Sequence, residues 1–253
     1  MKRIFLFVGL FTCGSFAYAN PALIQEKMAT GTVSQTNVTI TFPSPTIAGN
    51  SIIASTFYSP SVVWNKTGGC HITDDKGNAY IPGPQTSTSI SNTFSVAILT
   101  STSAIAGVTA ISFNCTTISA SGAEFYASEW SNVPSAVDVS TQQFLTSGIP
   151  VGIGVTPTTT NGIIYCHSRV FSSFPTGVGA PWLGFADDTT AWEISYLINP
   201  GAGGPFKPTL TTSTQNYLSA CISLPGVSAY IPQTQFSIQG GRMFIQGGKV
   251  ANK

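Results

Sequence analysis

The stretch Leu218-Ser219-Ala220-Cys221-Ile222-Ser223-Leu224 alternates apolar and small polar side chains along its whole length. Successive side chains of a β-strand point to opposite faces of the sheet, so a period of two predicts a strand with one apolar face. Val38-Thr39-Ile40-Thr41-Phe42 shows the same alternation near the other end of the chain. No stretch between them sustains a helical period. The alternation therefore predicts an all-β protein.

About ten strands are expected from such runs and from the Gly, Pro, Asn and Ser/Thr turns between them. They are predicted at 31–42, 49–58, 70–74, 93–100, 108–115, 123–130, 138–144, 162–171, 192–198 and 216–224. Frequent turns without helical crossovers favour a single antiparallel β-sandwich over 31–224. Eight alternating apolar residues are predicted to lie in its core: Ile40, Phe42, Ile52, Ile111, Phe113, Leu218, Ala220 and Ile222.

The first nineteen residues have the organisation of a signal peptide. Lys2 and Arg3 precede an apolar run from Ile4 to Phe11, and Ala17-Tyr18-Ala19 has the small-x-small pattern of a cleavage site. The run is shorter than the ~20 residues that span a bilayer, so no transmembrane segment is expected. We expect secretion, to the medium or the cell surface with the periplasm as an alternative, and a lead at 20–30. Cys13 leaves lipidation as a further alternative.

The composition is poor in charge, since only 8% of the residues are ionic. The exposed faces are therefore expected to be rich in hydroxyl groups. Without Lys2 and Arg3, the chain keeps eight Lys and Arg against nine Asp and Glu. No basic stripe is available to neutralise phosphates, which argues against nucleic acid as a partner.

Four cysteines remain after the signal, and an even number in an oxidising compartment predicts two disulfides. Cys70 and Cys115 both lie on the apolar faces of their strands, so this pairing is favoured. The second pairing, Cys166 with Cys221, is less direct. Cys221 shares a face with Ser219 and Ser223, whereas Cys166 lies opposite His167 and Arg169 and so looks inward. Such a bridge requires a bulge or a strand that is buried on both faces.

Each of these pairs contains a Cys-His dipeptide, Cys70-His71 and Cys166-His167. Adjacent residues of a strand point to opposite faces, so one dipeptide cannot give two ligands to one ion. Neither a metal nor a cofactor is expected.

Four short blocks follow one another in a characteristic order. They are Thr46–Ala54 with Ala48-Gly49-Asn50, Ile72–Tyr80 with Asp74-x-x-Gly77-Asn78-x-Tyr80, Ala127–Val133 with Glu129-Trp130-Ser131-Asn132, and Thr158–Ile164 with Thr158-Thr159. This series resembles a widespread bacterial and phage extracellular β-sandwich module with "AGN", "DxxGNxY" and "EYSGV" motifs. The resemblance extends from about residue 31 to 224.

The resemblance implies a jelly-roll or lectin-like sandwich of the kind found on secreted, cell-surface and virion proteins, usually without an assigned enzymatic activity. The chain departs from the pattern in its four cysteines and in Asn132, which stands where the motif has Gly. Asn132 must then adopt a backbone conformation that Gly adopts freely.

Catalytic motifs are not evident in the sequence, and we expect a protein that is not an enzyme. It has no G-x-S-x-G, no H-E-x-x-H, no phosphate loop and no dinucleotide fingerprint. A glycosidase needs two carboxylates at one groove. Glu124 and Glu129 are close on one strand, but their odd spacing points them to opposite faces.

Aromatic and acidic residues gather at 171–192, among Pro and Gly residues that indicate a loop. Exposed aromatics beside carboxylates can stack on sugars and hydrogen-bond their hydroxyls. The glycan-binding candidates are Phe174, Trp182, Phe185, Asp187, Asp188 and Trp192. The favoured alternative is that the aromatics cap the end of the sandwich and that Asp187-Asp188 forms a turn. For Asp74-Asp75, a hairpin turn is similarly favoured over a calcium site.

The residues after Pro225 form a distinct tail over 225–253. Ile238-Gln239-Gly240-Gly241 recurs seven residues later as Ile245-Gln246-Gly247-Gly248. The repeat predicts a small hairpin, or an edge that pairs with another chain, through Ile238, Gln239, Ile245 and Gln246. A disordered terminus is the alternative.

The sequence leaves three functions open. The leading expectation is a secreted, non-catalytic module that acts by contact, in a structural or adhesive role. The second is a lectin-like glycan-binding protein that uses the 171–192 loop, and the third is a polysaccharide-active enzyme. The partners expected are a glycan or a surface protein, and other copies of the chain through the tail.

Overall fold

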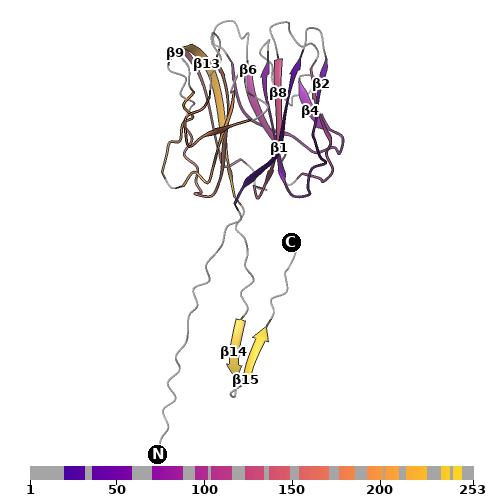
Figure 1. Ribbon diagram of the computed structural model, residues 1–253, viewed down its shortest axis with the longest axis vertical. Helices are drawn as coiled ribbons and strands as arrows, with labels where there is room; N and C mark the ends of the chain where they lie inside the picture. Colours follow the sequence, from indigo (N-terminus) through magenta and orange to yellow (C-terminus); the bar gives the residue numbers. More distant parts are fainter. Residues whose placement is uncertain are drawn as a thin grey trace, which may run out of the picture. The chain divides into compact units, whose positions relative to one another are not determined.

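Antiparallel sheets make up the whole of the described fold in the computed structural model (Figure 1). The structure describes residues 20–31, 36–58, 70–87, 95–101, 104–115, 123–133, 137–148, 154–170, 177–185, 193–201, 203–210, 215–226, 235–239 and 242–246. These residues contain no helix, and hence none that could cross a membrane. The all-β class and the antiparallel sandwich expected from the alternation are thus confirmed.

Two five-stranded sheets and one three-stranded sheet form the domain. The first sheet has the order β1 (Ala22–Gly31), β8 (Ala123–Ser131), β3 (Ser51–Tyr58), β6 (Ser95–Ser101) and β5 (Ile81–Ser87). The second has the order β11 (Leu183–Gly184), β12 (Ile194–Ile198), β10 (Gly162–Val170), β13 (Gln215–Pro225) and β9 (Val139–Gly148). The third has the order β2 (Asn37–Thr41), β7 (Ala110–Asn114) and β4 (His71–Asp74).

The sheets stack in three layers, and the sheet of β3 and β8 is the central one. Figure 1 shows the order of the layers, from β9 and β13 on the left through β6 and β8 to β2 and β4 on the right. Ile52 and Ala54 of β3 belong to a buried cluster with Ile40 of β2 and Phe113 of β7. Ile53, the residue between them, belongs to another cluster shared with the sheet of β10 and β13. Opposite faces of one strand therefore pack against two different sheets.

Burial of both faces explains the sequence of β3. Ser51-Ile52-Ile53-Ala54-Ser55-Thr56-Phe57-Tyr58 is buried at every position, so it has no polar face and no alternation. Small hydroxyl side chains can be buried there because they find partners inside the protein. The Oγ of Ser55 lies 2.8 Å from the phenol oxygen of Tyr165, and the Oγ of Ser128 accepts a 2.8 Å hydrogen bond from the indole of Trp130. Some of the hydroxyl groups that were expected at the surface are therefore buried and form hydrogen bonds inside the protein.

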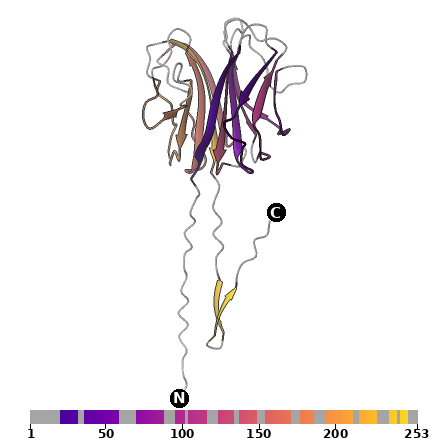
Figure 2. The same cartoon turned by 45° about the vertical axis from the view of Figure 1, so that its right-hand side comes forward.

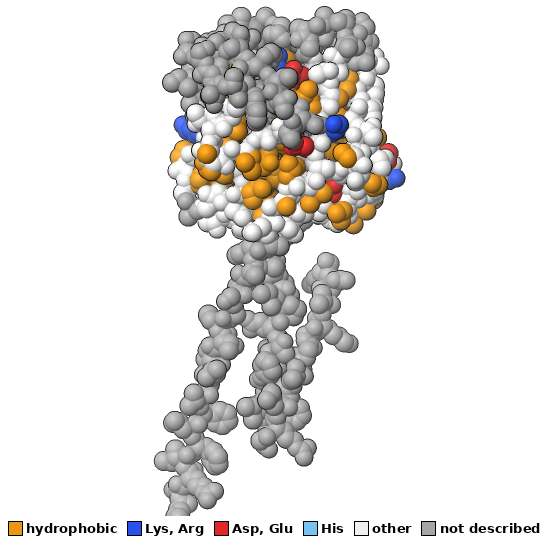
Figure 3. All heavy atoms as spheres, viewed as in Figure 1, with side chains coloured by type: hydrophobic (Ala, Val, Ile, Leu, Met, Phe, Trp, Pro, Cys, Tyr) orange, Lys and Arg blue, Asp and Glu red, His pale blue; other side chains and the backbone are white. Residues whose placement is uncertain are grey.

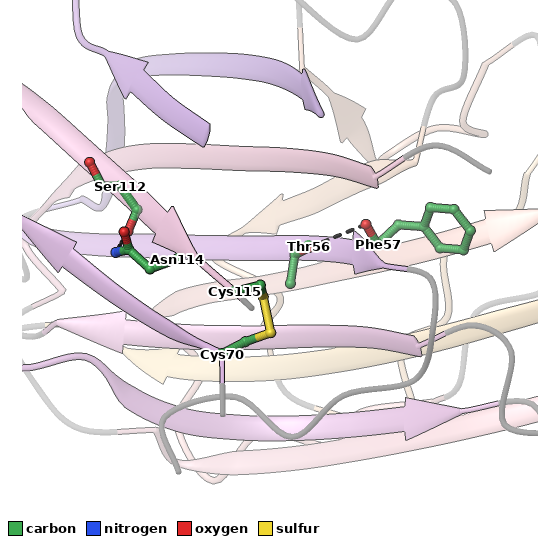
Figure 4. Close-up of a disulfide and its surroundings, with 6 residues drawn as sticks. All are labelled: Thr56, Phe57, Cys70, Ser112, Asn114 and Cys115. Atoms are coloured by element: carbon green, nitrogen blue, oxygen red, sulfur yellow. Dashed lines mark hydrogen bonds between the residues drawn. A yellow bond between two sulfur atoms is a disulfide. The ribbon is translucent and has the colours of Figure 1, made fainter. Parts of the chain in front are cut away.

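Both disulfides form, Cys70 with Cys115 and Cys166 with Cys221. The first joins the chain just before β4 to the residue after β7 (Figure 4). The second links directly opposed residues of β10 and β13. Loops cover the outer face of this sheet, where Val155 and Trp182 pack in one cluster with Cys166 and Cys221. Burial on both faces is the condition under which the second pairing was expected.

Each of the ten predicted ranges contains a strand, and all eight predicted core residues are buried. The range 31–42 was too long, since Gly31 ends β1 and β2 begins only at Asn37. Three strands of the domain were not expected. β1 occupies Ala22–Gly31, where only a lead was predicted, and pairs with β8 along its length. β5 was not predicted because it contains Pro82 and Pro84, and proline is unusual within a strand. β11 has only two residues, too few to show an alternation.

The tail contains the hairpin that its repeat predicted. β14 (Gln235–Gln239) pairs antiparallel with β15 (Arg242–Gln246), and Gln239 lies opposite Arg242. This hairpin belongs to a unit separate from the one formed by Asn20–Val227.

Candidate functional site

The strands run between two ends of the domain (Figure 2). We call the end that carries both chain termini of the domain the terminal end. Asn199 marks it, since its Nδ2 donates to the Oδ1 of Asn20 and its backbone pairs with Gly162. Gly226, at the other terminus, donates its N–H to the carbonyl of Asn161. The two termini of the domain are therefore neighbours.

We call the opposite end the loop end. β1, β3 and β10 finish there, at Gly31, Tyr58 and Val170. β8 and β12 begin there, as their pairing registers require. The described residues at this end therefore include Tyr58, Ala123, Val170 and Glu193, at which the described chain stops or resumes. Binding residues are commonly carried by loops on a rigid scaffold, so the loop end is the candidate functional site.

Charged side chains converge between the central and outer five-stranded sheets just inside the loop end. Arg169 of β10 donates from Nη1 to the Oε2 of Glu124 on β8 at 2.7 Å, and also to Glu193, the residue before β12. Its guanidinium lies 4.3 Å from the ring centroid of Phe57. One cation thus joins two carboxylates and an aromatic ring from both sheets.

His167 and Tyr126 complete this ionic cluster, which we define as Glu124, Tyr126, His167, Arg169 and Glu193. The Nε2 of His167 lies 3.2 Å from the Oε2 of Glu193, and the Tyr126 hydroxyl lies 3.3 Å from both carboxylates. His167 and Glu193 are fully buried, whereas the side chains of Glu124 and Arg169 are 17% and 13% exposed. The members of the cluster that contact solvent are therefore Glu124 and Arg169, and each does so only slightly.

Burial sets the protonation of the cluster. It raises the pKa of Glu124 to about 7, helped by the charge of Glu193 and opposed by Arg169. It lowers the pKa of His167 to about 3, so the ring is neutral at pH 7 and donates from Nε2 to Glu193. The Nδ1 of His167 is buried and has no hydrogen-bond partner among the described residues. Burial disfavours the charge of Arg169, but the two carboxylates prevail and raise its pKa.

The ionic cluster resembles a structural clamp more than a catalytic pair. Its two carboxylates accept from the same guanidinium and the same phenol, so their oxygens are directed at groups of the protein itself. Two grooves in the described part of the chain are lined by other residues. One, of about 660 Å³, lies between residues 81–84 of β5 and 140–142 of β9. The other, of about 340 Å³, lies beside Ile24, Ile47 and Glu129.

Sequence reasoning missed this cluster because it placed His167 and Arg169 on the outer face of β10. That placement was wrong, since both residues contact the central sheet. The sequence does contain a signal for the correct placement. Ile163 and Tyr165, which are large and apolar, occupy alternate positions with His167 and Arg169, so all four residues lie on one face of β10 and that face is expected to be buried. Glu193 precedes its strand and gave no comparable signal. Glu124 and Glu129 do lie on opposite faces of β8, as expected.

The glycan-binding candidates divide into two groups. Trp182 and Phe185 are 6% and 1% exposed. Phe185 packs 5.9 Å from the ring of Tyr165, and Trp182 covers the second disulfide. Neither ring is a free face on which a sugar could stack. Phe174, Asp187, Asp188 and Trp192 lie outside the described residues, on segments that adjoin the loop end.

Residues of the resemblance motifs hydrogen-bond to one another. The carboxylate of Asp74 accepts from the Nδ2 and N–H of Asn78, the hydroxyl of Tyr80 and the N–H of Lys76. These bonds close a tight turn after β4. The hairpin that the sequence favoured at Asp74-Asp75 does not form, because β4 pairs with β7 whereas the next strand, β5, pairs with β6 in another sheet.

The other motifs have similar internal bonds. Glu129 is fully buried and accepts from the Nδ2 of Asn50 at 2.6 Å and the N–H of Ile47 at 2.7 Å, which ties the first motif to the third. Thr158 donates to Asp138 from its N–H and its hydroxyl. Asn132 has φ 60°, the left-handed conformation expected where the motif has Gly.

No family model, no curated protein and no solved structure matches the chain.

Proposed function

We propose that the protein is a secreted extracellular module that acts by contact, with the loop end as its contact surface. The separation of the two ends carries this proposal. The termini of the domain lie together at one end, so the chain leaves the domain at the end opposite the loop end. A scaffold of three layers with two disulfides is suited to hold that end in a fixed shape outside the cell.

The chemistry of the interior supports a non-catalytic role. The strongest concentration of charge, the ionic cluster, is committed to joining two sheets. The motif carboxylates Asp74 and Glu129, and Asp138 beside the Thr158 motif, bind turns and neighbouring strands. On the face of the domain shown in Figure 3, few of the described side chains are charged.

Fractionation of cells that express the full chain tests the secreted part of the proposal. We expect a chain that begins at Asn20, lies outside the cytoplasm and contains no free thiol among Cys70, Cys115, Cys166 and Cys221. An uncleaved chain that stays in the cytoplasm with reduced cysteines would contradict it. The contact part is tested by binding of the labelled domain to the surface of those cells, with Asp187→Ala/Asp188→Ala as the loop-end variant and exposed Lys207→Ala as the matched control.

A glycan is the second candidate partner, and one observation favours it. The segments that carry Phe174, Asp187 and Trp192 adjoin Val170 and Glu193, which are close in space because Ser168 donates its N–H to the Glu193 carbonyl at 2.8 Å. A glycan array of the secreted domain decides this point. Binding that is lost in Trp192→Ala and Asp187→Ala, and kept in Lys207→Ala, would make the protein a lectin. Trp182→Ala is a poor test because that ring is buried.

A further inference from the structure

The edges of the three sheets differ in how well they resist pairing with another strand. β1 carries Glu26 and Lys27, and β5 carries Pro82 and Pro84. β11, β4 and β2 have only two, four and five residues. Charge, proline and shortness are the usual means by which edge strands avoid association. Each of these five edges has at least one of them.

β9 has none of these protections. It is ten residues long, Val-Ser-Thr-Gln-Gln-Phe-Leu-Thr-Ser-Gly, without a charge or a proline. It pairs with β13 on one side, and residues 140–148 make no other backbone hydrogen bond within the part of the chain that the structure describes. Ser140 and Gln142 are exposed. The Oγ1 of Thr141 is buried without a hydrogen-bond partner among the described residues. The edge is open to an added strand.

The tail hairpin has the complementary composition. Its register pairs Phe236 with Ile245 and Ile238 with Met243, so two of its five residue pairs consist of apolar residue types. An isolated hairpin is only marginally stable in water, so a hairpin of this composition needs a partner. The groove beside β9 offers apolar cover on its β5 wall, where Ile81 is 56% exposed.

We propose that the free edge of β9 accepts the tail hairpin, residues 235–246, of a second copy of the chain. A strand of the hairpin extends the outer sheet by main-chain hydrogen bonds, and the hairpin lies over the groove between β9 and β5. This groove is lined by residues 140–142, toward the terminal end, so the inference does not depend on what the loop end contacts.

The path of the chain favours a second copy over the same copy. Asp138 leads into β9 beside Ser223, with its N–H bonded to the Ser223 carbonyl, and β13 ends two residues later at Pro225. A tail returning to its own β9 would have to pass the segment that enters that strand. Connections that cross at one edge of a sheet are avoided. The tail of another copy reaches the edge without such a crossing.

An interface between a tail and an edge is heterologous, because the two partners use different surfaces. Each copy offers one tail and one edge, so copies can add head to tail without closing a ring. The expected product is an open chain of subunits.

Two defective proteins test the proposal. The first is the chain from Asn20 with Ser140→Lys and Gln142→Lys, which keeps the tail but charges the edge. The second is residues 20–227, which keeps the edge but lacks the tail and corresponds to a complete structural unit. Thr30→Lys, at an exposed position on the β1 edge, is the matched control. Near-ultraviolet circular dichroism and thermal melting establish that each protein is folded.

Sedimentation velocity over a range of concentrations gives the readout. The intact chain and Thr30→Lys should form oligomers whose size grows with concentration, whereas each defective protein should remain a monomer. Their equimolar mixture should form a 1:1 dimer and nothing larger, because it has one competent tail and one competent edge. Three outcomes would overturn the proposal: an intact chain that stays monomeric, an edge variant that still self-associates, or a mixture that contains monomers alone.

Discussion

Replacing Arg169 with Met removes the cation from between two buried carboxylates while keeping most of the side-chain volume. Breaking a buried ion pair by removing one partner costs about 3–5 kcal/mol, because the remaining charge is left uncompensated. The guanidinium side chain is only 13% exposed, so solvent screening reduces this figure little. Domains of this size lose about 2–4 °C of Tm per kcal/mol, so we expect Tm to fall by about 6–20 °C at pH 8.

The loss should shrink as the pH falls. Without Arg169, both Glu124 and Glu193 can relieve their repulsion by taking up protons, and that uptake costs less at acid pH. Thermal melting at pH 5 and pH 8 measures the difference. Lys207→Met is the control, since this exposed side chain should change stability by no more than about 0.5 kcal/mol.

Neutralising the carboxylates as well should restore part of the loss. The triple variant Arg169→Met/Glu124→Gln/Glu193→Gln leaves no buried charge in the ionic cluster, and replacement of whole buried ion networks is often neutral. Our account of the cluster would be refuted by a loss below about 1 kcal/mol for Arg169→Met, or by equal losses at pH 5 and pH 8.

The remaining predictions concern single elements of the scaffold. The pKa of Glu124 rises on folding from 4.5 to about 7, so this carboxyl contributes stability below pH 4.5 that is lost as the pH rises to 7. Glu124→Gln should remove that decline. Because His167 changes the stability in the opposite sense, the measurement is the difference between the free energies of unfolding of the variant and the parent, obtained with denaturant at each pH. Cys166→Ala/Cys221→Ala opens a loop with a sequence separation of 55 and should cost about 4 kcal/mol in the chain-entropy treatment; an unchanged urea midpoint would argue against it. Glu129→Ala leaves several buried donors without their acceptor and should cost about 2–4 kcal/mol, whereas an increase in Tm would show that burial of its charge outweighs those bonds.

The sequence predicted the fold best where a sheet has one buried face. Ile40 and Phe42 are buried while Thr39 and Thr41 are exposed, so β2 alternates and its role could be inferred. The first disulfide followed from the same parity. The turn at Asp74 was predictable because its bonds are local, within six residues.

The central layer was beyond such reasoning. β3 shows no alternation because a different sheet covers each of its faces. When both faces of a strand are buried, both need apolar or small side chains, so the sequence does not indicate which residues point to which face. The parity of β10 was misassigned for the same reason, since a Cys on one face and a His on the other are both buried there. The ionic cluster depends on Glu193 meeting Arg169 across neighbouring strands, a non-local contact that no pattern in the sequence encodes.

The position of Asn20 and Gly226 at the same end of the domain affects how the fold can be combined with other proteins. A domain whose ends are neighbours can be inserted into a surface turn of a host protein with short linkers at both junctions, because it does not force the host's chain apart. The loop end, with the connections between its strands, would then project away from the host. Grafted binding sequences in those connections would be displayed on a covalently stapled support, which makes this sandwich a usable framework for engineered recognition.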